Sequence, residues 1–448
     1  MAEFRSCPAC RADLTLEKCG IFVPRMELED LIPDTDNLDK AIGEINDEYE
    51  SFSVRKKDFR QLLAGANVID FLELGAYFPD IEQNDKPPKM FQSIDSYEII
   101  FDGTSKVLHL GVGGTTINME HLFCHNCGYI LPDGFFTHPY LQIPLIGTPS
   151  TGKTCSLMGI YEYLNTEHAT DRQIEFAESE DLLWFFGRNY YSKLYRDFRR
   201  GNLPTGTQKS QPPLFFKINK KNNEYILVGL IDAAGEEYKK ARGPGPNRTR
   251  KSELLWVFVP APFFFDEVDT TPVGEPKPLT AKKKELEGEQ LIEAQIPANN
   301  DEDQLVHENL LSAIPKDRQT RLAFTLSQAD KLKNIHDTQA QKVYQLLHLN
   351  KEMLVDFDAH CRAMSEAVRP VVERKDRELL WSNMPSDRLC EKSYFAISAL
   401  GDAVTLVPVA DAETNVRRWQ MHGRPTPLCV VEPLLWLIKD YLRNGGKT

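Results

Sequence analysis

The sequence has no long apolar run and no excess of positive charge. No stretch of its 448 residues approaches the roughly 20 apolar residues that a membrane helix needs. The opening MAEFRSCPAC lacks the apolar core of a signal peptide. We therefore expect a cytoplasmic protein that does not enter the membrane. The net charge of −13 argues against nonspecific binding of nucleic acid by the whole chain.

The cysteine content does not favour a disulfide framework, because nine is an odd number and a cytoplasmic chain is expected to keep its thiols reduced. Two C-x-x-C pairs stand out: Cys7 with Cys10, and Cys124 with Cys127. Each pair can aim two thiolates at one tetrahedral zinc ion, and a redox role is the alternative. We predict one structural zinc in a ribbon that is split by a long insertion. Other cysteines are expected to be small buried apolar side chains: Cys155, Cys361, Cys390 and Cys429.

Acidic residues are concentrated in one block. Residues 27–50 hold ten acids and a single lysine. Such a block is typical of a solvated face or a mobile segment, and a docking surface for a basic partner is the alternative.

Eight residues in the middle of the chain, 147–154, spell GTPSTGKT. This is the G-x-x-x-x-G-K-[ST] pattern of a phosphate-binding loop, in which the glycines let backbone N–H groups surround phosphates. We expect Lys153 to reach the β- and γ-phosphates as a solvated side chain, and Thr154 to bind Mg²⁺. The apolar run 141–146 precedes the loop as a strand would, and 155–163 follows it with helical character. A glycine turn without a ligand is the alternative, and the complete pattern favours nucleotide binding.

A second motif directly follows the apolar run 225–231. Asp232 can hold Mg²⁺, usually through water, and Gly235 can donate its backbone N–H to a γ-phosphate. Together with the earlier run 214–218, this strand predicts an antiparallel β-hairpin.

The segment before that hairpin, 203–207, is expected to supply a threonine to the metal and the γ-phosphate. We favour Thr207 for this role, Thr205 is close behind it, and an inert Pro/Gly turn is the alternative. An arginine could act as a finger within the chain or across a homodimer: one in the stretch 242–251 (RGPGPNRTRK), or Arg196, Arg199 or Arg200.

Two further motifs follow the predicted strands 322–326 and 394–397. Asp330, in the segment Ser327-Gln328-Ala329-Asp330, can accept hydrogen bonds from the N1–H and the amine of guanine. The segment Ser398-Ala399-Leu400 can offer a backbone N–H to the guanine oxygen. All four motifs come at the carboxyl ends of predicted strands, where ligands bind in open α/β sheets.

In these motifs the chain resembles the TRAFAC class of P-loop GTPases over about residues 138–443. It is more closely similar to the bacterial double-GTPase families of biological conflict and defence operons, some of which carry zinc ribbons. The resemblance implies a slow, Mg²⁺-dependent GTPase that acts as a switch, with GTP, GDP and effector proteins as partners. It implies these nucleotide-binding residues: Gly147, Ser150, Thr151, Gly152, Lys153, Thr154, Cys155, Ser327, Gln328, Asp330, Ser398, Ala399 and Leu400. The catalytic residues would be Lys153, Thr154, Thr207, Asp232, Gly235 and Glu236, with Mg²⁺ at Thr154, Thr207 and Asp232.

Some positions depart from the pattern of that class. Ser327 and Gln328 replace the usual Asn/Thr and Lys, which weakens the prediction of guanine specificity. Glu236 stands where many members use glutamine, so it would either hold the attacking water or slow hydrolysis by repulsion. Pro149 stiffens the loop where glycine is common. A nucleotide-gated scaffold with little hydrolysis and an ATPase are therefore the alternatives.

The predicted fold class is α/β, a doubly wound P-loop NTPase sheet with an antiparallel hairpin, because strands alternate with helices from about residue 136 onward. The predicted domains are a split zinc ribbon at 1–14 and 118–135, a small α+β insertion at 15–117, and a GTPase domain at 136–448 with a mobile excursion at 266–304.

Predicted helices lie at 59–77, 180–200, 281–294, 335–371 (one or two helices) and 432–442 (amphipathic). Further predicted strands lie at 97–101, 106–110 and 254–259, and 394–397 is expected to be the last strand. The aromatic side chains of 180–200 are expected in the core, and nucleic-acid stacking is the alternative.

Overall fold

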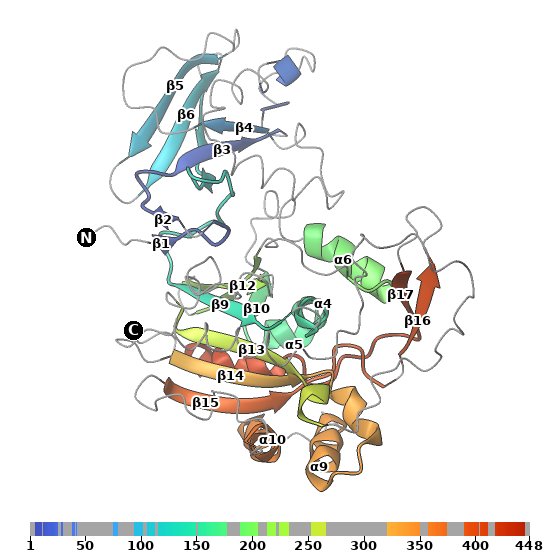
Figure 1. Cartoon of the computed structure of the whole chain (residues 1–448). Helices are drawn as coiled ribbons and strands as arrows, with labels where there is room; N and C mark the ends of the chain where they lie inside the picture. Colours follow the sequence, from blue (N-terminus) through green and yellow to red (C-terminus); the bar gives the residue numbers. More distant parts are fainter. Residues whose placement is uncertain are drawn as a thin grey trace. The chain divides into compact units, whose positions relative to one another are not determined.

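The structure, a computed structural model, describes most of the predicted α/β part and several segments before it (Figure 1). The described residues are 5–10, 12–25, 28–29, 38–40, 42, 75–78, 94–101, 105–112, 115–148, 151–176, 189–204, 213–220, 224–232, 252–265, 320–349, 357–373, 389–402, 404–410 and 417–443.

The chain divides into two compact units, each built from three segments. The first comprises Met1–Gln142, Asp171–Tyr191 and Lys209–Ile231, and the second Ile143–Thr170, Ser192–Gln208 and Asp232–Thr448.

The strands of the described residues are β1 Arg5–Ser6, β2 Asp13–Leu14, β3 Gly20–Pro24, β4 Gly75–Phe78, β5 Ile94–Phe101, β6 Lys106–Val112, β7 Thr115–Met119, β8 Leu122–Phe123, β9 Tyr140–Ile146, β10 Ile174–Phe176, β11 Leu214–Asn219, β12 Tyr225–Asp232, β13 Leu254–Pro260, β14 Thr320–Ser327, β15 Leu389–Ala396, β16 Thr405–Ala410 and β17 Arg417–His422. The helices are α4 Lys153–Leu164, α5 Glu167–Asp171, α6 Asn189–Arg199, η6 Ala261–Phe264, η7 Ala329–Asn334, α9 Thr338–Leu347, α10 Phe357–Val372, α11 Glu432–Leu437 and α12 Lys439–Arg443.

The largest sheet has seven strands in the order β10-β11-β12-β9-β13-β14-β15. Strands β9, β13, β14 and β15 pair with one another in parallel in that order, so their carboxyl ends lie at one edge. Their apolar runs reflect this position, because strands of a parallel sheet are covered on both faces. Strands β11 and β12 pair antiparallel, from Leu214↔Leu230 to Asn219↔Tyr225. The predicted α/β class and the predicted hairpin are thus confirmed.

Smaller sheets lie in the first unit. Strands β5, β6 and β7 form an antiparallel meander, and β3 pairs with both β4 and β8. The meander confirms the strands predicted at 97–101 and 106–110.

In the second unit, helices cover the parallel strands. Figure 1 shows α10 beside β15, and α10 also packs against α9, while α11 packs on β13 and β14. Helix α9 is capped at its N-terminus by Asp337, whose carboxylate accepts hydrogen bonds from the backbone N–H groups of Gln339 and Ala340. Helices α9 and α10 confirm two helices within the predicted stretch 335–371. Among the helices of the described residues, none combines the length and the apolar composition that a membrane crossing requires.

Three local predictions are wrong. The strand at 394–397 is not the last one, because the hairpin of β16 and β17 follows it. The closing segment 432–442 is not one amphipathic helix, since it breaks at Ile438 and all six residues of α11 are buried. Residues 75–77 of the predicted helix 59–77 lie instead in strand β4, which pairs with β3, so the prediction is wrong there; residues 59–74 lie outside the described part and stay a prediction.

The aromatic helix is described from residue 189 onward as α6. Its Tyr191 and Phe198 are buried, and the Tyr195 ring lies 5.4 Å from that of Tyr161 on α4. These contacts support the core interpretation. The segments 180–188, 266–304 and 281–294 lie outside the described residues.

Candidate functional site

The phosphate-binding loop connects β9 to α4 and depends on two glycines for different reasons. A Cβ atom on Gly147 would lie 2.7 Å from the carbonyl oxygen of Phe258 and 2.8 Å from Oγ1 of Thr151, so no larger residue fits. Gly152 has a φ of +82°, which other residues rarely adopt, and a Cβ there would meet nothing within 4 Å. The loop is therefore crowded on the sheet side and open at Gly152.

Lys153 is buried, with 6% of its surface exposed. Its ammonium donates hydrogen bonds to the carbonyl oxygens of Gly147 at 2.8 Å and Thr148 at 3.0 Å. The expectation of a solvated lysine that adds little to the core is wrong, because these bonds close the loop from inside. Pro149 and Ser150 lie outside the described residues.

Thr154 and Asp232 meet at the same edge of the sheet. Oγ1 of Thr154, in the first turn of α4, donates a 2.6 Å hydrogen bond to Oδ2 of Asp232, the last residue of β12. Asp232 is fully buried. Hydroxyl and carboxylate oxygens are ligands that Mg²⁺ prefers, so the donor chemistry of this pair fits that ion.

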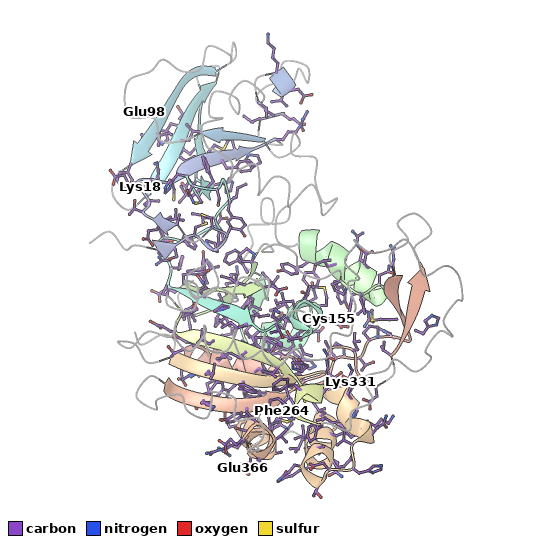
Figure 2. All side chains as sticks on the ribbon, in the orientation of Figure 1. Lys18, Glu98, Cys155, Phe264, Lys331 and Glu366 are labelled. Atoms are coloured by element: carbon purple, nitrogen blue, oxygen red, sulfur yellow. The ribbon has the colours of Figure 1, made fainter. Side chains whose placement is uncertain are left out.

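Cys155 follows in the first turn of α4, where Figure 2 labels it. It is half-buried, and burial together with the nearby carboxylate of Asp232 raises the pKa of its thiol to about 12. The thiol therefore stays neutral near pH 7, and the backbone N–H of Cys155 is the group available to an anion at this helix start.

The carboxyl ends of β14 and β15 bring Asp330 and Ser398 together. Oγ of Ser398 donates a 2.5 Å hydrogen bond to Oδ1 of Asp330 and accepts one from the backbone N–H of Gly401 at 2.9 Å. The N–H of Ala329 also donates to the carbonyl oxygen of Ile397 at 3.0 Å. The two predicted base motifs thus form one hydrogen-bonded unit.

Burial raises the pKa of the Asp330 carboxyl above its ordinary value, and the hydrogen bond from Ser398 opposes that shift. Lys331, which Figure 2 labels in η7, was not singled out from the sequence. Burial lowers the pKa of Lys331, and the neighbouring Asp330 carboxylate acts in the opposite direction. The only sequence signal for the pairing of Asp330 with Lys331 is that the lysine directly follows the aspartate.

The remaining residues of the two base motifs shape the backbone. Gln328 has a left-handed φ of 55° just before η7, and Ser327 is buried at the end of β14. Ala399 and Leu400 are half-buried, and the carbonyl oxygen of Leu400 accepts a 3.0 Å hydrogen bond from the N–H of Thr426.

Several predicted site residues lie outside the described part of the chain: Ser150, Thr205, Thr207, Gly235 and Glu236. Their roles stay predictions.

The candidate nucleotide site thus comprises a P-loop, a carboxylate at the end of the adjacent strand and an Asp–Ser pair at the ends of the last two parallel strands. A scan against family models matches residues 142–377 to Double-GTPase 2. The chain belongs to the Double-GTPase 2 family. A search of curated proteins found no match.

Membership of this Double-GTPase family confirms the predicted relationship and supports GTP binding or hydrolysis in general terms. The family also implies Mg²⁺ as the usual cofactor. The matched region contains the P-loop, Asp232 and Asp330, and it ends before Ser398.

A second site in this Double-GTPase chain, the four-cysteine cluster, consists of Cys7, Cys10, Cys124 and Cys127, whose sulfur atoms all lie within 4.8 Å of one another. The Sγ atoms of Cys7 and Cys127 are 3.8 Å apart, and those of Cys10 and Cys124 are 3.7 Å apart. A tetrahedral zinc with Zn–S distances of about 2.3 Å holds its sulfurs roughly 3.8 Å apart. The cluster therefore fits structural zinc.

Local hydrogen bonds favour a thiolate at Cys10 of the four-cysteine cluster. Nδ2 of Asn126 donates to Sγ of Cys10 at 3.1 Å. Hydrogen bonds from the other thiols, that of Cys124 foremost, lower the pKa of Cys10, whereas burial raises that of Cys7. Four sulfurs this close cannot all ionise without a cation among them. The arrangement is compatible with a single metal site formed by all four cysteines.

The four-cysteine cluster shares its apolar surroundings with the hairpin of the main sheet. Phe215 of β11 and Leu227 of β12 belong to the same buried group as Cys7 and Cys124. Cys19, which the sequence analysis did not consider, is buried in this group, and burial raises its pKa to about 12. Of the cysteines expected in the core, Cys361 and Cys429 are buried, Cys155 is half-buried, and no exposure is described for Cys390.

Proposed function

We propose that this Double-GTPase chain binds GTP with Mg²⁺ and hydrolyses it slowly, as a switch whose nucleotide state controls partner binding. The observation that carries the proposal is the hydrogen bond between Thr154 and Asp232. It joins the P-loop helix to the strand-end carboxylate, the two protein groups that organise the metal in a P-loop NTPase.

In this proposal the P-loop stabilises phosphate charge. Backbone N–H groups from Thr151 to Cys155 face the α- and β-phosphates at the start of α4. The ammonium of Lys153 exchanges contacts with the loop carbonyls for contacts with the β- and γ-phosphates. Thr154 and Asp232 hold Mg²⁺, which when bound offsets the charge of the transferring phosphoryl group.

Guanine would be recognised by the Asp330–Ser398 pair. The second oxygen of the Asp330 carboxylate and the backbone N–H groups near Ala399 are the polar groups that the motif offers to a base. The hydrogen bond from Ser398 fixes the carboxylate orientation, so the acceptor geometry is set before the base arrives.

The proposed switch lies largely in segments outside the described residues, namely 205–212 and 233–251. We propose that 201–213, with Thr207, and 235–252, with Gly235 and Glu236, change order with the nucleotide state. Of the arginines predicted as fingers, Arg199 already pairs with Glu162 at 3.3 Å, so Arg196, Arg200 or an arginine of 242–251 is the better candidate.

The proposals for zinc and for protein partners rest on the four cysteines and on the resemblance to double-GTPase families. We propose one structural zinc in a split ribbon at 1–14 and 118–135, with an insertion at 15–117 and the GTPase domain at 136–448. Effector proteins, operon partners of a defence system or a second copy would read the nucleotide state.

The deciding experiment is a binding titration with GTP, GDP, ATP and ADP, with and without Mg²⁺, followed by measurement of phosphate release. The proposal expects Mg²⁺-dependent preference for GTP over ATP and slow release of phosphate. Preference for ATP would assign an ATPase, an alternative that Ser327 and Gln328 allow because they weaken the prediction of guanine specificity. Tight GTP binding without phosphate release would assign a nucleotide-gated scaffold. Binding of no nucleotide would overturn the proposal.

A further inference from the structure

A second group of metal-ligating side chains lies in the interior of the second unit. His360 of α10, Cys429 and Glu432 of α11 place their ligand atoms within 4.8 Å of one another. Each is more than nine-tenths buried, with exposed fractions of 5%, 6% and 8%. We call these three residues the His–Cys–Glu cluster. It shares no residue with the phosphate loop, the base motifs or the four-cysteine cluster.

Ordinary packing does not account for the His–Cys–Glu cluster. Oε2 of Glu432 is buried and makes no hydrogen bond to any described residue. A buried carboxylate oxygen without a partner is unfavourable unless a cation or a proton compensates it. Cys429 has a left-handed φ of 54°, which is strained for a residue other than glycine. Strain and a buried carboxylate at one point are typical of a site shaped for a ligand.

We propose that His360, Cys429 and Glu432 bind a zinc-class divalent cation. Imidazole, thiolate and carboxylate are the three zinc ligand types of proteins. Nε2 of His360 lies 3.9 Å from Sγ of Cys429. A tetrahedral zinc would hold these atoms roughly 3.6 Å apart, so a movement of a few tenths of an ångström closes the site. On binding, the Cys429 thiol releases its proton to solvent.

A fourth ligand is available nearby. The carbonyl oxygen of Leu347, at the end of α9, lies 3.9 Å from Sγ of Cys429. Either this oxygen or a water molecule would complete four-coordination. Since the protein ligands are buried, the ion would have a structural role and not a catalytic one.

The segment that carries Cys429 holds the proposed base site and the phosphate-loop helix together. Ser398 and Leu428 exchange two backbone hydrogen bonds, at 3.0 and 2.8 Å. A Cβ atom on Gly159 of α4 would lie 3.1 Å from Val430, which shows how closely the segment packs on that helix. The metal would therefore fix the backbone that supports both parts. This consequence rests on the proposed function, whereas the metal site itself does not.

Elemental analysis of the full chain, purified without chelator, tests the proposal. About two zinc ions per chain are expected, one in each cluster. Glu432→Gln, which keeps the side-chain shape, and Cys429→Ser should each lower the content to about one. Cys361→Ser is the matched control, because Cys361 is an equally buried cysteine next to His360 but lies outside the His–Cys–Glu cluster, and it should retain both ions. If Cys429→Ser fails to fold, Glu432→Gln decides.

A complementary variant isolates the new site. Cys124→Ser with Cys127→Ser removes the ligands of the four-cysteine cluster and should leave about one metal per chain. Loaded with Co²⁺, it should show thiolate-to-cobalt charge-transfer absorption that disappears when Cys429→Ser is added. One zinc in the wild type that persists in Glu432→Gln, or no cobalt–thiolate absorption in the double variant, would overturn the proposal. Neither measurement depends on GTP, so failure here is distinguishable from failure of the proposed function.

Discussion

Thr154 and Asp232 are 78 positions apart in the sequence, yet their side chains share a 2.6 Å hydrogen bond. The contact is made where α4 begins and β12 ends, so it depends on the strand order of the main sheet and not on either motif alone. It is the most direct structural link between the two motifs proposed to bind metal and phosphate.

Asp232→Asn keeps the shape of this side chain and removes its charge. We expect the Mg²⁺ concentration needed for half-maximal phosphate release to rise roughly tenfold to a hundredfold, as for a lost charged interaction of about 1.5–3 kcal/mol. A Mg²⁺ titration measures this. Asp337→Asn is the matched control, because asparagine also caps a helix and Asp337 lies at α9. An unchanged Mg²⁺ dependence in Asp232→Asn would contradict the assignment.

Lys153→Ala should lower GTP turnover by roughly 10²–10³-fold, since it removes a preorganised donor to the transferring phosphate. The bonds to Gly147 and Thr148 predict an additional loss of about 1–3 kcal/mol in the free energy of unfolding. Single-turnover kinetics and chemical denaturation check the two effects separately. Lys342→Ala, at an exposed position of α9, should change neither. Normal turnover in Lys153→Ala would remove the central assignment.

Asp330→Asn should weaken GTP binding roughly tenfold to a hundredfold more than ATP binding, because it removes a charged acceptor for guanine. Competition titrations with both nucleotides give the ratio directly. The hydrogen bond from Ser398 can persist, because the asparagine oxygen still accepts it. Equal losses for the two nucleotides would favour the ATPase alternative.

The same variant should show a pH-dependent gain in stability. Burial raises the pKa of Asp330, so the folded chain keeps this proton to a higher pH than the unfolded chain does. Stability from this group is complete below the ordinary aspartate pKa and is lost as pH rises through the raised value. The unfolding free energy of Asp330→Asn, relative to the wild type, should therefore increase from acidic to neutral pH. The ordinary pKa of an aspartate carboxyl is about 3.9. A difference in unfolding free energy that stays constant between pH 3 and pH 7 would therefore be evidence against the burial effect.

Gly147→Ala should destabilise the chain by about 1–3 kcal/mol, because the new methyl group overpacks against Phe258 and Thr151. Gly152→Ala meets no atom and should lose only the roughly 1–2 kcal/mol of a left-handed backbone. Thermal denaturation of the two variants compares crowding with strain. If Gly152→Ala proved the more damaging change for stability, the described loop packing would be incorrect.

Much of the α/β part could be predicted from the sequence, because its signals are local. The apolar runs that became β12, β13 and β14 are almost wholly buried, and β12 and β14 end at the motifs expected there. Asp330 and Ser398 were predicted to share a ligand because parallel strands end at one edge, and the structure joins them directly.

Other features had no local signal. His360, Cys429 and Glu432 come from separate elements, and no spacing rule relates residues 69 positions apart. The complete burial of α11, its Glu432 included, had no local signal, because packing on β13 and β14 decides it. The β16–β17 hairpin was not predicted, and Pro408 within its first strand is a residue type that sheets accept mainly at edges.

The two C-x-x-C pairs also bear on how this chain could change over evolution. The Sγ atoms of Cys10 and Cys124 are in contact, and β3 pairs with β8. The long segment between the two cysteines therefore starts and ends at the same place. The entropy of closing a loop grows only slowly with its length. The segment between Cys10 and Cys124 can therefore vary in length and surface at little cost in closure entropy, while the four-cysteine cluster that holds its two ends stays the same.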